Sequence, residues 1–207
     1  MSEEPVVFAS GEWFERSQEK LRTSEDFKKA AATWEGGVVR CIIDVEDQAA
    51  VEDYRTEDGI KGFISMVSLL SKEDRLKYKD TALEKLANKV GYTFADDPAG
   101  VNIPEVVKKA ADFTIDDFKG CVVYASWWTD RGVLKEMDPI APDAHPDAPF
   151  TLAGSYSAWK QLCNGEQTAI QLIMGGNMKL EGNLKYIMKH MAAVNQLAEV
   201  YKSIPLK

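Results

Sequence analysis

The chain has 207 residues, 45% of them hydrophobic and 28% charged, and a formal net charge of −8. This length is enough to bury a sizeable hydrophobic core. The acidic balance argues against a nucleic-acid partner, and the absence of any apolar run of about 18 residues argues against a transmembrane segment.

The N-terminal part of the chain predicts two short helices followed by a strand. Apolar residues recur at helical spacing between Trp13 and Trp34, and the pattern slips near Ser24, which can cap a second helix. Gly36 and Gly37 end the helical pattern. The β-branched run 38–45 then predicts the first strand.

Residues 46–120 predict a mostly helical insertion after this strand. Apolar periodicity indicates helices over 60–70, 72–90 and 104–111, and the segment 92–101 is typical of a loop.

A hairpin follows the insertion. The run 121–128 predicts a strand, residues 129–132 form a turn that contains a glycine, and 133–137 is the returning strand. Trp127 and Trp128 are adjacent on the first strand, so their rings point to opposite faces of the sheet. The four prolines within 138–149 indicate a surface loop.

The C-terminal part predicts two strands, two short helices and one long helix. Residues 150–154 and 177–182 alternate as strands, with short helices between them, the first capped by Ser155 or Ser157. Residues 184–201 predict one amphipathic helix, with His190 on its exposed polar face. Its apolar stripe consists of Leu184, Ile187, Met188, Met191, Val194, Leu197, Ala198 and Tyr201.

This order predicts an α+β fold, in which a sheet of about five strands is backed by helices within one domain spanning residues 1–207. The long C-terminal helix needs a sheet against which to bury its stripe.

No catalytic or metal site is expected from the titratable residues. The three cysteines, Cys41, Cys121 and Cys163, contain no CxxC pair and are typical of reduced thiols in a core. Asp143, His145 and Asp147 are metal-like ligand types, but a proline-rich loop favours a solvated acidic segment. No cofactor is expected either.

The motifs from Cys121 to Tyr201 resemble the sterol carrier protein type 2 family. They comprise the hairpin with its Asp130-Arg131-Gly132 turn, the strand before the Trp159 helix, the step from Gly165 to Gln167, and the strand-to-helix turn from Gly176 to Asn183. The resemblance implies a five-stranded sheet backed by helices, enclosing an apolar tunnel for fatty acids, acyl-CoAs or sterols. The insertion and the missing peroxisomal C-terminal signal depart from the family pattern.

The resemblance, together with four methionines in the C-terminal part, suggests a set of ligand-binding residues. Packing in an ordinary core is the alternative for this set. Gln167 could bind the polar end of a ligand or could be an exposed residue at a helix start. The candidates are Trp127, Trp159, Leu162, Gln167, Ile170, Met174, Met178, Leu180, Leu184, Ile187, Met188 and Met191.

The expected function is that of a non-catalytic carrier that binds a hydrophobic small molecule in an apolar tunnel. The alternative is an accessory subunit that docks on an enzyme or on a second copy of itself. An enzyme acting on a hydrophobic substrate is a third option, for which the sequence offers no convincing titratable group. The N-terminus lacks the basic and apolar regions of a secretory signal, which favours a cytoplasmic location.

Overall fold

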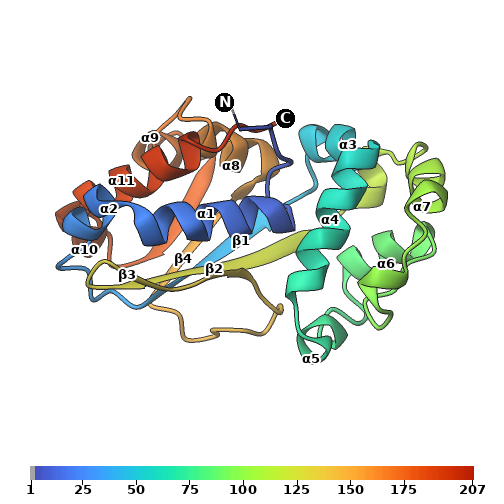
Figure 1. Ribbon diagram of the computed structural model, residues 1–207, viewed down its shortest axis with the longest axis horizontal. Coiled ribbons are helices and arrows are strands. Elements are labelled where there is room, and N and C mark those ends of the chain that lie inside the picture. Colours follow the sequence, from blue (N-terminus) through green and yellow to red (C-terminus); the bar gives the residue numbers. More distant parts are fainter. Residues whose placement is uncertain (1–2) are drawn as a thin grey trace.

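The computed structural model describes residues 3–207 and contains one mixed five-stranded sheet (Figure 1). The strand order is β3-β2-β1-β4-β5. The central strands β1 and β4 pair in parallel, whereas the other neighbours pair antiparallel. The strands are β1 Val38–Asp44, β2 Val122–Asp130, β3 Val133–Pro139, β4 Phe150–Ser155 and β5 Met178–Gly182. The predicted α+β fold with about five strands is confirmed.

Two helices from the N-terminus and four from the C-terminus lie against the sheet (Figure 1). The last helix, α11, contacts α1, α2 and α8. In Figure 1 the loop from β3 to β4 lies on the other side of the sheet from α8 and α11. The six helices are α1 Gly11–Thr23, α2 Glu25–Ala30, α8 Tyr156–Cys163, α9 Ala169–Met174, α10 Leu184–Lys189 and α11 Met191–Lys202.

The segment between β1 and β2 is helical and lies at one end of the sheet, on the right of Figure 1. The predicted single helix over 72–90 is wrong, because Asp80 has a φ of 66° and Thr81 caps a new helix. The helices are α3 Gln48–Tyr54, α4 Glu57–Leu69, α5 Lys72–Leu76, α6 Ala82–Lys89 and α7 Ile103–Ala110, with 3₁₀ turns η1 Pro98–Gly100 and η2 Ile115–Phe118.

Side-chain caps explain why several helices begin where they do. Ser24 accepts a hydrogen bond from the Phe27 amide, as expected from the slip in the helical pattern, and Ser155 accepts one from the Ala158 amide. Each cap satisfies an amide that has no partner within its helix. These caps divide the chain into short helices.

His190 corrects two sequence predictions. The predicted single helix over 184–201 is interrupted at His190, which separates α10 from α11, and the side chain is only 5% exposed. Its Nδ1 lies 2.9 Å from the carbonyl oxygen of Tyr186, and its Nε2 lies 3.0 Å from that of Thr33. The imidazole is therefore held between α10 and the segment before β1, and it is buried instead of facing solvent.

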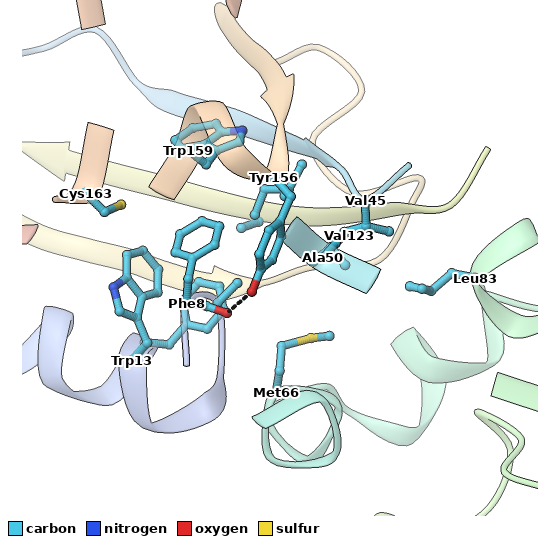
Figure 2. Packing of buried hydrophobic residues seen from close by; sticks show 14 of the residues in the cluster. Phe8, Trp13, Val45, Ala50, Met66, Leu83, Val123, Tyr156, Trp159 and Cys163 are labelled. Atoms are coloured by element: carbon cyan, nitrogen blue, oxygen red, sulfur yellow. Dashed lines mark hydrogen bonds between the residues drawn. The ribbon is translucent and has the colours of Figure 1, made fainter. Parts of the chain in front are cut away.

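The core begins on the helix-covered face of the sheet and continues into the helical segment (Figure 2). Tyr156 of α8 stands edge-on to Phe8, with ring centroids 5.2 Å apart, and Phe8 packs in the same way on Trp13. The Tyr156 hydroxyl donates to Asp53 of α3 at 2.8 Å. Aromatic packing and this partly buried bond thus join the sheet, the N-terminal helices and the helical segment.

Gly132 provides a test of how the β2–β3 hairpin packs on α2. Its φ is 81°, and an added Cβ would lie 2.4 Å from the carbonyl oxygen of Lys28. Gly176 has a similar φ of 76° but open space around it. We expect Gly176→Ala to lower the free energy of unfolding by about 1 kcal/mol through backbone strain. Gly132→Ala should lower it by about 2 kcal/mol more, because of the added clash.

Chemical denaturation of both variants beside the parent chain measures this difference. Equal losses for the two variants would show that the hairpin does not pack on α2 as described.

Candidate functional site

An apolar cavity lies between the sheet and the helices that cover it. Its volume is about 80 Å³, counted as the space open to the centre of a water molecule. All five strands except β3 contribute to its wall, together with α8, α9, α10 and α11. The lining residues are Trp34, Val39, Cys41, Trp127, Leu152, Trp159, Leu162, Ala169, Ile173, Leu180, Ile187, Val194, Leu197, Ala198 and Tyr201.

The register of the sheet places the strand residues of this wall side by side. Cys41 of β1 lies opposite Leu152 of β4, and Leu152 lies opposite Leu180 of β5. Trp127 of β2 lies opposite Val39 of β1. Paired residues share a face of the sheet, so the four strands present one continuous apolar floor to the cavity.

The chemistry of the cavity is that of a hydrophobic binding site. None of its fifteen lining residues is charged. Burial raises the pKa of the Cys41 thiol to about 12, so this thiol stays protonated and neutral at physiological pH. One water molecule needs about 10–15 Å³ on the same measure of volume. The cavity therefore has room for several water-sized groups, or for a short apolar segment of a ligand.

A second apolar cavity lies in the helical segment and is smaller, at about 30 Å³. Its walls include Ile60 and Phe63 of α4, Leu83 and Leu86 of α6, and Val106 of α7. This space is comparable with that of a few water molecules. The cavity over the sheet is therefore the stronger candidate site.

The structure brings five of the twelve predicted ligand-binding residues to the cavity. These are Trp127, Trp159, Leu162, Leu180 and Ile187. Trp128 is 39% exposed, as expected for the neighbour of Trp127 that points to the opposite face.

The other seven predicted residues do not border the cavity. Met174, Leu184 and Met188 are at the surface, with exposed fractions of 83%, 50% and 53%. Met178 is buried against Gly154, whereas Gln167, Ile170 and Met191 are partly buried elsewhere.

Ten residues of the wall are absent from the predicted set, and four of them lie outside the helices that follow β4. Val39 and Cys41 come from β1, Leu152 from β4, and Trp34 from the segment before β1. Their period-two alternation on predicted strands was the available signal, since Val39, Cys41 and Ile43 share one face of β1. The strand pairing was needed to connect them with the C-terminal helices.

The polar cluster of Ser126, Glu136 and His145 does not have the geometry of a nucleophile with its base. Ser126 hydrogen-bonds Glu136, and Nε2 of His145 lies 2.9 Å from the same carboxylate oxygen of Glu136. The serine and the imidazole thus share a carboxylate, whereas a nucleophile must contact its base directly. Within residues 3–207 no group of three or more histidine, cysteine or acidic side chains is placed to bind a metal. The described helices also include none long and apolar enough to cross a membrane.

Two solved structures share the fold. One is a crystal structure of sterol carrier protein 2, 15% identical, with a TM-score of 0.55; the alignment covers 95% of this chain and 98% of that one. The other is the solution structure of a conserved hypothetical protein from Thermus thermophilus, described as a candidate sterol carrier protein. It is 14% identical, with a TM-score of 0.56, and the alignment covers 100% of this chain and 95% of that one. A comparison with curated proteins gives no match.

The family comparison agrees with these structures. The model of the SCP-2 sterol transfer family matches residues 74–195, which is more than half of the chain. The match includes the second half of the helical segment, the hairpin, β4, β5 and most of the helices that border the cavity. The fold, the cavity and this match lead to one conclusion: the chain belongs to the SCP-2 sterol transfer family.

Proposed function

We propose that the protein is a non-catalytic carrier that binds a hydrophobic small molecule, such as a fatty acid, an acyl-CoA or a sterol-like lipid. The observation that carries this proposal is the apolar cavity of about 80 Å³ between the sheet and the helices that cover it. Protein interiors usually close voids of this size, because unfilled space loses dispersion contacts. A retained cavity with uncharged walls is consistent with a site for an apolar ligand.

Burial in this cavity can supply the binding energy. Each methylene removed from water contributes about 0.8 kcal/mol before the cost of ordering the ligand. A chain of eight methylenes thus gains about 6 kcal/mol, which approaches micromolar affinity once a polar contact is added. A longer lipid has to displace the helices that cover the sheet, because the cavity holds only a short apolar segment.

The thiols support a reducing compartment such as the cytoplasm for this carrier. Cys41, Cys121 and Cys163 are all free cysteines. Burial raises the pKa of Cys121 to about 12, so this thiol is not activated as a nucleophile.

Filling the cavity should block lipid binding. Ala198 of α11 lines the cavity, and Ala198→Phe places a ring in the existing space. We expect affinity for a fluorescent sterol or fatty acid to fall at least tenfold, while the melting temperature stays constant or rises, because cavity filling adds packing contacts. Fluorescence titration and thermal unfolding measure the two effects.

Ala192→Phe is the matched control, because Ala192 is exposed on the same helix. This variant should bind the probe like the parent chain. If a folded Ala198→Phe protein binds the probe as tightly as the parent chain, the cavity is not the site of lipid binding.

A docking role is the second candidate function, and the exposed apolar side chains of α9 and α10 favour it. Met174, Leu184 and Met188 are each at least half exposed. Such side chains stabilise an interface with a second copy of the chain or with an enzyme.

The double variant Leu184→Lys/Met188→Lys tests the docking role. We expect it to keep the lipid affinity of the parent chain, because neither residue borders the cavity. Sedimentation velocity over a range of concentrations should show the same species for the parent and the variant. A parent dimer that dissociates in the double variant would favour the docking role over a simple carrier.

A further inference from the structure

The outer face of α10 carries two exposed apolar side chains. Leu184 and Met188 are each at least half exposed, and their spacing of four residues places them on the same face of the helix. Ile187 lies on the inner face, where it is buried and borders the cavity. One face of α10 is thus on the cavity and the other is in solvent.

Basic side chains flank these apolar residues. Lys185 and Lys189 are exposed on α10, and within residues 3–207 neither of them forms an ion pair. Residues 182–198 include no acidic side chain. Glu181, just before α10, is paired with Lys179 at 2.6 Å. The two lysines of α10 therefore keep their positive charge available to a partner.

The tip of the β2–β3 hairpin lies at the same end of the sheet as α10 (Figure 1). The guanidinium of Arg131, in the hairpin turn, pairs with the carboxylate of Glu35 at 2.7 Å, and the main-chain amide of Glu35 donates to the hydroxyl of Tyr186 on α10 at 2.7 Å. The hairpin also exposes Trp128 and Val133. Exposed apolar side chains from two elements thus gather at this end of the molecule.

Charge is distributed unevenly along the molecule. Residues 46–120, which form the helical segment on the right of Figure 1, include 16 acidic and 11 basic residues, a net charge of −5. Residues 177–198, which include α10 on the left, have three lysines and one glutamate, a net charge of +2. An anionic surface attracts the α10 end and repels the helical segment, so it orients the whole molecule.

This combination of side chains fits a lipid surface better than a second copy of the chain. Exposed apolar residues beside lysines, with a tryptophan close by, are typical of segments that lie at a membrane interface. In a two-fold dimer built on this face, the lysines of one copy meet those of the other, which is unfavourable. The headgroups of an anionic leaflet attract them instead.

We propose that the α10 end of the protein docks on an anionic lipid surface, with Leu184 and Met188 inserted among the lipids and Lys185 and Lys189 at the headgroups. This inference goes beyond the carrier function and does not require it, because none of the four docking residues borders the cavity. In a protein that is also a carrier, the cavity lies behind the docked helix, where Ile187 borders it.

Co-sedimentation with vesicles tests the docking. The full chain is mixed with vesicles of phosphatidylcholine alone, or of equal parts of phosphatidylcholine and phosphatidylglycerol. We expect the affinity for the anionic vesicles to be about tenfold higher or more, and to fall steeply between about 50 mM and about 500 mM salt, because salt screens the headgroup charges. Equal binding to the two kinds of vesicle, or no binding to either, overturns the inference.

Two double variants separate the lysines from the apolar residues. Each lysine near an anionic leaflet contributes about a fivefold gain in affinity, so Lys185→Gln/Lys189→Gln should lower the affinity for anionic vesicles about 25-fold. Leu184→Ser/Met188→Ser should lower it about tenfold, because less apolar surface is inserted. The melting temperature of both variants should match that of the parent chain, since all four side chains are exposed.

The matched controls lie in and beside α5, in the helical segment. Lys72→Gln/Lys79→Gln removes the same charge from two exposed lysines, and Leu76→Ser removes an exposed apolar side chain. Both controls should bind anionic vesicles like the parent chain. Losses as large as those of the α10 variants would show that net charge or general apolar exposure determines binding, and would contradict docking through α10.

Methionine methyl NMR gives the orientation of the bound protein. Met174 of α9 and Met188 of α10 are both exposed, and β5 separates the two helices along the chain. With a paramagnetic lipid in anionic bicelles, we expect the Met188 methyl resonance to broaden more than that of Met174. Broadening of Met174 alone contradicts docking through α10.

One further outcome assigns this face to a different partner. A parent dimer that Leu184→Ser/Met188→Ser dissociates, without binding of the parent chain to vesicles, would assign it to a second copy and overturn the inference. The carrier function is tested separately by titration with the fluorescent lipid in the absence of vesicles. Either proposal can therefore fail while the other stands.

Discussion

The parallel pairing of β1 with β4 is the contact on which the cavity depends. The register sets Val39 opposite Phe150 and Cys41 opposite Leu152, so both strands present their apolar residues to the same side. A parallel pair needs a crossover between its strands, and this one contains the helical segment and the β2–β3 hairpin. Loop-closure entropy grows only slowly with loop length. The sheet can therefore accommodate a long crossover at modest cost, provided that the crossover has its own packing.

The helical segment meets that condition through polar and apolar contacts with the rest of the chain. Asp53 of α3 accepts hydrogen bonds from Tyr156 at 2.8 Å and from Lys160 at 2.9 Å, both on α8. The buried hydroxyl of Tyr78 donates to the carbonyl oxygen of Ile140 at 2.7 Å, in the loop after β3. These bonds join the segment to α8, which lines the cavity, and to the loop on the far side of the sheet. That the helical segment is an insertion in the family fold stays a prediction.

The sequence predicted the positions of the strands along the chain better than the identity of the site residues. Local signals such as the cap at Ser24 and the turn predicted over 129–132 depend on neighbouring residues. The cap was confirmed, and the turn is present but shorter, at Arg131 and Gly132, because Thr129 and Asp130 belong to β2. The apolar stripe of the predicted helix includes both Ile187 and Met188. Helical periodicity alone could not show that only Ile187 borders the cavity, since adjacent residues on a short helix differ only in the direction of their side chains. The interruption at His190 depends on a carbonyl group of Thr33, 157 residues away in the sequence. No local pattern contains that information.

The wall of the cavity combines large and small residues. Trp34, Trp127 and Trp159 contribute rings, whereas Ala169, Ala198 and Cys41 contribute small side chains. Methionines, which adapt to irregular gaps, lie elsewhere: Met178 is packed against Gly154, and Met174 and Met188 are at the surface. Rings and branched side chains have few rotamers. A wall built from them changes its shape little, so the proposed carrier would select its ligand by the size of the apolar part.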